Sequence, residues 1–169
     1  MDWVPVISRW AHIMPVIVLV GGSFFMRFVL QPAMRGLPAE EAGALRERVT
    51  RVWKMFVHIG ILFLLLSGFY NYLFVMTPAH KGDGKYHMFM GIKILVACLV
   101  IFLSIALTSR GAWSEKFRRS SGLWLLLNLL LAFTVVGISG FLKVRGVPEK
   151  VTAAVAAPEA SSPPAETKK

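Results

Sequence analysis

The side chains of this chain that can carry chemistry are four histidines, a lysine and an arginine within apolar runs, and several methionines. His12 and His87 each lie near the start of a long apolar run, and Lys93 follows His87 by six residues. Neutral imidazole is a common metal ligand. A cation at membrane depth is costly, so Lys93 suggests a role inside a helix bundle.

His12 and His87 are predicted to lie at matching depth at the outer end of their helices. Gly91, one helical turn below His87, leaves room for a flat macrocycle. Two facing imidazoles in a four-helix membrane bundle can ligate haem b. The alternative is that each histidine sits at a helix interface and hydrogen-bonds a carbonyl or water. Both interpretations stay open.

Two cations accompany these histidines. Lys93 lies about 10 Å inside the outer boundary, where it would neutralise a haem propionate or another anionic ligand, or take part in proton transfer. The alternative for Lys93 is that its long stem carries the ammonium to the surface. Arg27 lies about one turn from the cytoplasmic end, and its long side chain is expected to carry the guanidinium to the membrane surface.

Methionines near the outer connection allow a second metal chemistry. Thioethers and imidazoles together suit copper(I), and the candidate residues are Met76, His80, His87, Met88 and Met90. Methionine is also a common filler of apolar cores, so packing is the alternative.

His58 lies about one turn into the second apolar run, and no other histidine is expected at its depth. Its predicted separation from His12 along the membrane normal is roughly 15–20 Å. Metal–imidazole bonds are only about 2 Å long, so His58 is not expected to share a metal with His12. The single cysteine, Cys98, provides neither a disulfide nor a thiolate cluster.

These residues belong to a chain with the composition of a membrane protein. It has 169 residues, of which 56% are hydrophobic, and a net charge of +10. Only 17% of the residues are charged, and those fall mainly between apolar runs. Short basic loops fix membrane orientation and attract anionic lipid. We therefore expect membrane lipid, and not nucleic acid, as the partner of the basic residues.

The predicted fold is all-α, an integral membrane four-helix up-down bundle. Each apolar run is long enough to cross a bilayer core of about 30 Å, and short connections favour antiparallel neighbours. Pro38, Glu40 and Glu41 predict a helix start before the second run. One domain is expected over residues 1–146, followed by a disordered, proline-rich tail at 147–169. The predicted helices cover about 7–30, 55–76, 86–108 and 123–142.

The first and third connections are the strongly basic ones. The positive-inside rule places them in the cytoplasm and both termini outside. The expected location is the plasma (inner) membrane, with several passes. The first apolar run follows no basic segment and precedes no small-residue cleavage site, so it is expected to stay as a helix.

The motifs resemble those of a known family. WAH followed by GGSFFMRFVLQPAMR, then VHIGILFLLLSGFYNYL and YHMFMGIKILVACLVIFLSIAL, are similar to the integral membrane family of copper-resistance protein D. They are also similar to the related oxygen-independent protoporphyrinogen oxidase of the haem pathway, a membrane protein that lacks flavin. The resemblance covers roughly residues 3–108.

The resemblance implies a bundle of four or five helices that binds haem b through histidine, with an arginine and a lysine also important. The matching positions are His12, Arg27, His87 and Lys93. Here six positions separate the histidine from the lysine, and no proline precedes Arg27 as it does in the oxidase. These departures point towards the copper-resistance-like members.

The sequence therefore predicts a haem-b-binding membrane protein, an electron-transfer or oxidoreductase component with a redox partner or a second copy of itself as partner. The first alternative is a copper-binding or copper-handling membrane protein. The second is a structural or assembly subunit without a cofactor. The sequence leaves open whether the chain is an enzyme, because it names no substrate.

Overall fold

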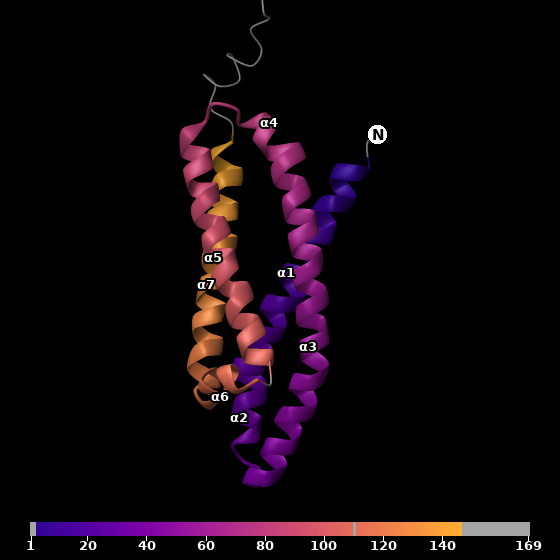
Figure 1. The fold of residues 1–169 in the computed structure, drawn as a ribbon, viewed down its shortest axis with the longest axis vertical. Coiled ribbons are helices and arrows are strands. Elements are labelled where there is room, and N and C mark those ends of the chain that lie inside the picture. Colours follow the sequence, from indigo (N-terminus) through magenta and orange to yellow (C-terminus); the bar gives the residue numbers. More distant parts are fainter. Residues whose placement is uncertain (1–2, 110, 147–169) are drawn as a thin grey trace, which may run out of the picture.

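The computed structural model describes residues 3–109 and 111–146, and the elements in this part are all helical (Figure 1). The elements in chain order are α1 (Val4–Phe25), η1 (Met26–Leu30), α2 (Gln31–Met34), α3 (Ala39–Tyr70), η2 (Asn71–Met76), α4 (Thr77–Ala79), α5 (Gly84–Thr108), η3 (Ala112–Ser114), α6 (Glu115–Arg119) and α7 (Ser121–Arg145). The segments η1 and η2 are π-helices and η3 is a 3-10 helix. The all-α prediction is confirmed.

Four helical stretches are long and apolar enough to cross a membrane, as predicted. They cover Val4–Met34, Ala39–Ala79, Gly84–Thr108 and Ser121–Arg145, so most of their ends lie several residues beyond the predicted ones. Polar residues at these ends lowered the apolar signal without ending the helix. The tail predicted for residues 147–169 lies outside the described residues.

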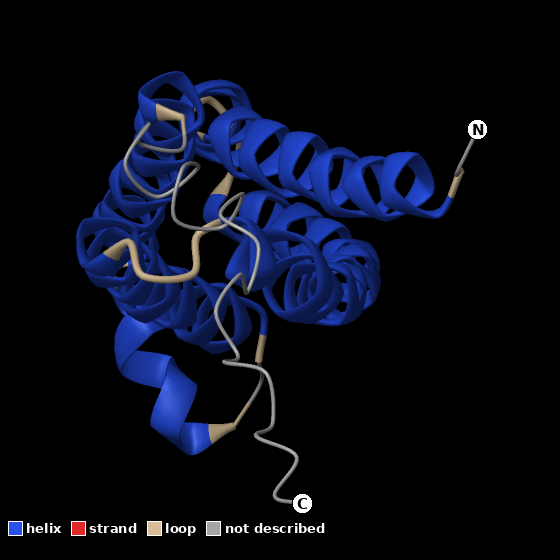
Figure 2. Ribbon diagram, turned by 90° about the horizontal axis from the view of Figure 1, so that it is seen from above, coloured by secondary structure: helices blue, strands red, loops and turns tan. Residues whose placement is uncertain are grey.

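The long helices pack as neighbours in chain order, and the α5–α7 and α1–α3 interfaces are the most extensive. In Figures 1 and 2 the N-terminal end of α1 leans away from α5 and α7. Helix α1 contacts α7 as well as α3. The four helices therefore enclose an interior to which α1, α3 and α5 contribute side chains.

Glycines allow α1 and α3 to approach closely. A Cβ on Gly60 would lie 2.9 Å from Leu19, and a Cβ on Gly22 would lie within the ring of Trp53. These contacts run in opposite order along the two helices, so α1 and α3 are antiparallel. Small residues at such interfaces are the usual way for membrane helices to gain packing contacts.

Helices α5 and α7 are joined by a polar and an aromatic contact. The Asn128 amide nitrogen donates a hydrogen bond of 3.2 Å to the Ser104 hydroxyl. The rings of Phe89 and Phe141 lie 5.2 Å apart. Asn128 thus makes a hydrogen bond between these two helices.

The two π-helices share a sequence signal. Residues 28–36 read FVLQPAMRG and residues 74–82 read FVMTPAHKG, so the same pattern recurs where each π-helix gives way to a short α-helix. Pro32 and Pro78 have no N–H, and their rings would clash with the carbonyl four residues earlier. A wider π-turn before the proline relieves that clash. This internal match was absent from the sequence-based prediction.

Helix α3 begins where the sequence predicted. Pro38 is the residue before its first turn, and Glu40 and Glu41 lie in that turn, where carboxylates interact favourably with the helix dipole. The stretch Ala39–Ala79 has 41 residues, about twice the 20 that a bilayer core requires. It is therefore longer than a bilayer crossing requires, and its first residues, next to the α2–α3 turn, are the polar ones.

Candidate functional site

The imidazole of His12 lies against helix α3 at Ser67 and Gly68. Its Nδ1 atom is 3.0 Å from the Ser67 hydroxyl oxygen. A Cβ on Gly68 would lie 3.2 Å from its Cε1 atom, so only glycine leaves the ring its full space. Two small residues of α3, Ser67 and Gly68, therefore contact the imidazole ring of His12.

Lys93 of α5 lies within electrostatic range of the His12 imidazole. Its side chain is half-buried. The carboxylates in the described part of the chain lie towards helix ends or in the extension of α3, and they are Glu40, Glu41, Glu47, Asp83 and Glu115. An imidazole and an ammonium thus share the interior with no carboxylate at their level.

The helix register gives His12 and Lys93 similar levels in the bundle. Gly68, which faces His12, precedes the end of α4 at Ala79 by about 16 Å of helix. Lys93 follows the start of α5 at Gly84, at the same end, by about 14 Å. His87 follows that start by only about 5 Å. The structure therefore brings His12 towards Lys93, about two helical turns from His87.

His87 has different neighbours. Its ring meets the edge of the Tyr86 ring, with centroids 5.6 Å apart. Among the described residues, neither a hydrogen bond nor a ring contact joins His12 to His87. The pairing of His12 with His87 on one haem remains a prediction.

His80 also contacts Tyr86. The two rings are stacked with centroids 3.7 Å apart, and His80 Nδ1 donates a hydrogen bond of 3.0 Å to the Met76 carbonyl. His80 and His87 thus both have ring contacts with Tyr86. In the described part of the chain, however, no three side chains of the His, Cys, Asp and Glu types are grouped to hold a metal ion.

The other copper candidates differ in their exposure. The side chain of Met88 is 56% exposed, so it points away from the bundle. Met76 and Met90 are half-buried. Within the predicted copper set, His80 and His87 contact the same residue, Tyr86, and the side chain of Met88 is directed outward.

Arg27 lies in η1, fifteen residues after His12. Its Nε atom is buried without a hydrogen-bond partner, and its guanidinium carbon lies 5.4 Å from the Phe28 ring centroid. The separation along the helix is about 22 Å, so Arg27 belongs to the α2 end of the bundle. The structure does not bring it to the His12–Lys93 pair.

Asp83 and Arg145 form an ion pair that the sequence analysis did not predict. Asp83 Oδ1 accepts hydrogen bonds from Arg145 Nη2 at 3.0 Å and from the Tyr86 backbone N–H at 3.1 Å. The guanidinium of Arg145 and the Tyr86 amide hold the pKa of the Asp83 carboxyl below its usual range, against the opposing effect of burial. The signal was the aspartate before a helix start, since Asp is a preferred N-cap residue.

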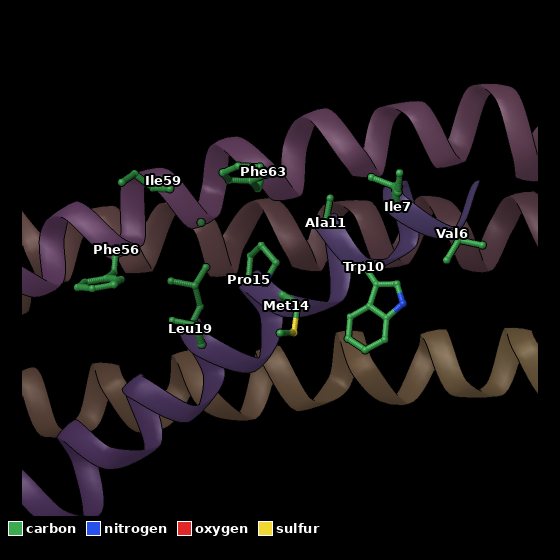
Figure 3. A pocket seen from close by; sticks show the side chains of 12 residues that line it. Val6, Ile7, Trp10, Ala11, Met14, Pro15, Leu19, Phe56, Ile59 and Phe63 are labelled. Atoms are coloured by element: carbon green, nitrogen blue, oxygen red, sulfur yellow. The ribbon is translucent and has the colours of Figure 1, made fainter. Parts of the chain in front are cut away.

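A groove of about 530 Å³ runs between α1 and α3 on a face from which His12 is absent. Figure 3 shows its lining, in which Trp10, Met14 and Pro15 of α1 lie opposite Phe56, Ile59 and Phe63 of α3. The lining is almost wholly apolar. It offers no polar group that would orient a ligand, so the His12–Lys93 pair is the better candidate site.

The geometry is therefore that of one imidazole, His12, and one ammonium, Lys93, held inside a bundle of apolar helices. Two further imidazoles, those of His80 and His87, lie at one end of the bundle. Comparisons with protein-family models, with curated proteins and with solved structures each found no match to this chain.

Proposed function

We propose that the chain is a multi-pass protein of the plasma (inner) membrane, with four spanning helices in an up-down bundle and both termini outside. Long helices with exposed apolar side chains support this, because Phe69, Phe74 and Leu95 are 68%, 68% and 65% exposed. The basic residues Arg46 and Arg51 lie in the α3 extension, on the side that the positive-inside rule assigns to the cytoplasm.

Reporter fusions test this topology. A reporter that is active only outside the membrane, fused after Ala112, should be silent, and the same reporter fused after Lys150 should be active. Equal activity from both fusions would contradict the up-down arrangement.

We further propose that this protein binds haem b through His12 and acts as an electron-transfer or oxidoreductase component. The observation that carries this proposal is the approach of His12 and Lys93 inside the bundle without a carboxylate at their level. An imidazole suits haem iron, and an ammonium suits an anionic propionate. His12 and Lys93 are therefore the residues that would hold the group.

Each residue has a definite task in this proposal. His12 would supply a ring nitrogen to the iron, and Lys93 would balance negative charge that is otherwise costly in the bundle. The apolar helices around them exclude water. Haem b bound there would supply a one-electron redox centre. The sequence predicts His87 as the second histidine that would hold the haem. The optical spectra described next test that prediction as well.

The decisive experiment is an optical spectrum of protein purified in detergent from haem-supplied cells. Wild type should show a Soret band that shifts on reduction. His12→Ala should lose most of the bound haem, because an axial bond is lost, while Lys93→Gln should weaken retention. If His87→Ala retains wild-type haem, His87 is not a ligand. A haem-free wild type from such cells would reject the proposal.

Copper handling is the second candidate, favoured by the ring contacts that His80 and His87 both make with Tyr86. Cu(I) accepts imidazole and thioether ligands, and Met76 is the methionine nearest in sequence to His80. Metal analysis after anaerobic loading should find copper in wild type and less in His80→Ala. If neither haem nor copper binds, a structural or assembly role remains.

A further inference from the structure

The hydrogen bonds around Ser67 fix which nitrogen of His12 carries the proton. The Ser67 hydroxyl donates to the Phe63 carbonyl at 2.5 Å. A hydroxyl has one hydrogen and two acceptor lone pairs, so the Ser67 oxygen can only accept from His12. The 3.0 Å contact to His12 Nδ1 is therefore donated by an Nδ1–H group.

We propose that Ser67 is a positioning residue that holds His12 as the neutral tautomer with its proton on Nδ1, so that Nε2 keeps a free lone pair. The tautomer follows from the contacts alone. Its use as the iron-binding nitrogen rests on the proposed haem function.

Burial makes this contact a stable constraint. Ser67 is 7% exposed, so water does not compete for its hydroxyl. Gly68 lets the imidazole lie close against α3, since a Cβ there would be 3.2 Å from His12 Cε1. A ring turned over by 180° would place Cδ2 at the Ser67 hydroxyl in place of Nδ1 and lose the hydrogen bond.

A second polar contact fixes the backbone of Ser67. The Asn71 amide nitrogen donates to the Ser67 carbonyl at 2.8 Å and to the Ser8 hydroxyl at 2.9 Å. Since Ser8 lies one turn before His12 on α1, this link ties the same two segments that the His12–Ser67 bond joins. Helix α1 cannot slide along α3 without breaking both.

The orientation of a ligating histidine is commonly set by the hydrogen bond of its other nitrogen. Partners of this kind fix the tautomer, and their loss typically costs about 10–100-fold in metal affinity. Ser67→Ala should weaken haem binding by a factor of about that size. Ser67→Thr should restore it, because a threonine hydroxyl can also bond to the carbonyl one turn earlier.

Nitrogen-15 NMR of histidine-labelled, haem-free protein in lipid tests the tautomer directly. The His12 signals, identified by their loss in His12→Gln, should show a protonated Nδ1 and an unprotonated Nε2. Ser67→Ala should shift His12 towards other protonation states, and Ser67→Thr should not. A proton on Nε2 in wild type, or an unchanged His12 in Ser67→Ala, would overturn the proposal.

Haem titration of the same variants separates this inference from the proposed function. If wild type shows the expected tautomer but binds no haem, the haem function fails and the role of Ser67 stands. If wild type binds haem and Ser67→Ala binds it equally well, Ser67 does not position the ligand. Comparable folding of the variants is checked by circular dichroism in each case.

Discussion

The ring of Trp53 occupies the space that a side chain on Gly22 would need. A Cβ built there would overlap Trp53 Cη2, closer than atoms that are not bonded to each other can approach. Trp53 has only two side-chain torsions and packs near Phe56. Any side chain at position 22 must therefore displace the indole or separate α1 from α3.

Gly22→Ala is expected to destabilise the α1–α3 pair by about 1–3 kcal/mol, the usual cost of overpacking a close contact. Unfolding in mixed micelles by a denaturing detergent measures this. Gly21→Ala is the matched control, because a Cβ at Gly21 meets nothing within 4 Å. Equal stability of the two variants would show that the indole moves aside freely.

The fold class could be predicted from the sequence because lipid imposes a simple rule. Backbone groups in an apolar solvent must bond within their own segment, so runs of about 20 apolar residues become helices. Boundaries were less accurate, since residues such as Arg145 lie in the last turn of a helix and carry no apolar signal. The start of α3 was an exception, because Pro38 and two glutamates mark it directly.

The residue types of the candidate site came from the sequence, and the pairing of His12 with His87 on one haem remains a prediction. The depths of His12, Lys93 and His87 were counted from the ends of the apolar runs. In the structure His12 lies against Gly68, at a level nearer to that of Lys93 than to that of His87 along α5. Register between helices depends on packing of small residues, which a single sequence does not reveal.

The Asp83–Arg145 ion pair should make stability fall in acid. The pKa of Asp83 is lowered in the folded protein, so its contribution is fully present above the pKa of the unfolded carboxyl. It is lost as the pH falls through the lower, folded pKa. Asp83→Asn should remove this part of the acid dependence and lower stability at neutral pH.

Thermal unfolding in detergent at several pH values measures that effect. Arg145→Gln should resemble Asp83→Asn, because one leaves the buried Asp83 carboxylate and the other the half-buried Arg145 guanidinium without its counter-charge. Lys143→Gln is the control, since Lys143 is exposed in the same final turn of α7. An unchanged acid profile in Asp83→Asn would show that other carboxyls dominate it.

Asn128 should be replaceable by an apolar residue at little cost. It is 3% exposed, and although its nitrogen bonds to Ser104, its Oδ1 atom is buried without a partner. Hydrogen bonds between membrane helices average only about 0.6 kcal/mol. Removal of an unsatisfied buried oxygen offsets that loss.

Asn128→Leu with Ser104→Ala should therefore be within about 1 kcal/mol of wild type, because both polar partners are removed together. Detergent unfolding of the double variant and both single variants gives the coupling between them. Ser104→Ala alone should be less stable than the double variant, since it leaves the whole Asn128 amide unpaired. A loss well above 1 kcal/mol in the double variant would mean that Asn128 has a partner outside this chain.

His58→Ala should leave bound haem nearly unchanged. His58 is exposed, and its Nδ1 donates a hydrogen bond of 2.7 Å to the Lys54 carbonyl of its own helix. It precedes Ser67, the partner of His12, by nine residues, or about 14 Å of helix, and metal–imidazole bonds are only about 2 Å long. His58 and His12 therefore cannot share one iron. The haem-to-protein ratio of purified His58→Ala, compared with that of His12→Ala, measures this. Haem lost from His58→Ala and kept by His12→Ala would move the cofactor to the cytoplasmic half of α3 and remove His12 and Lys93 from the site.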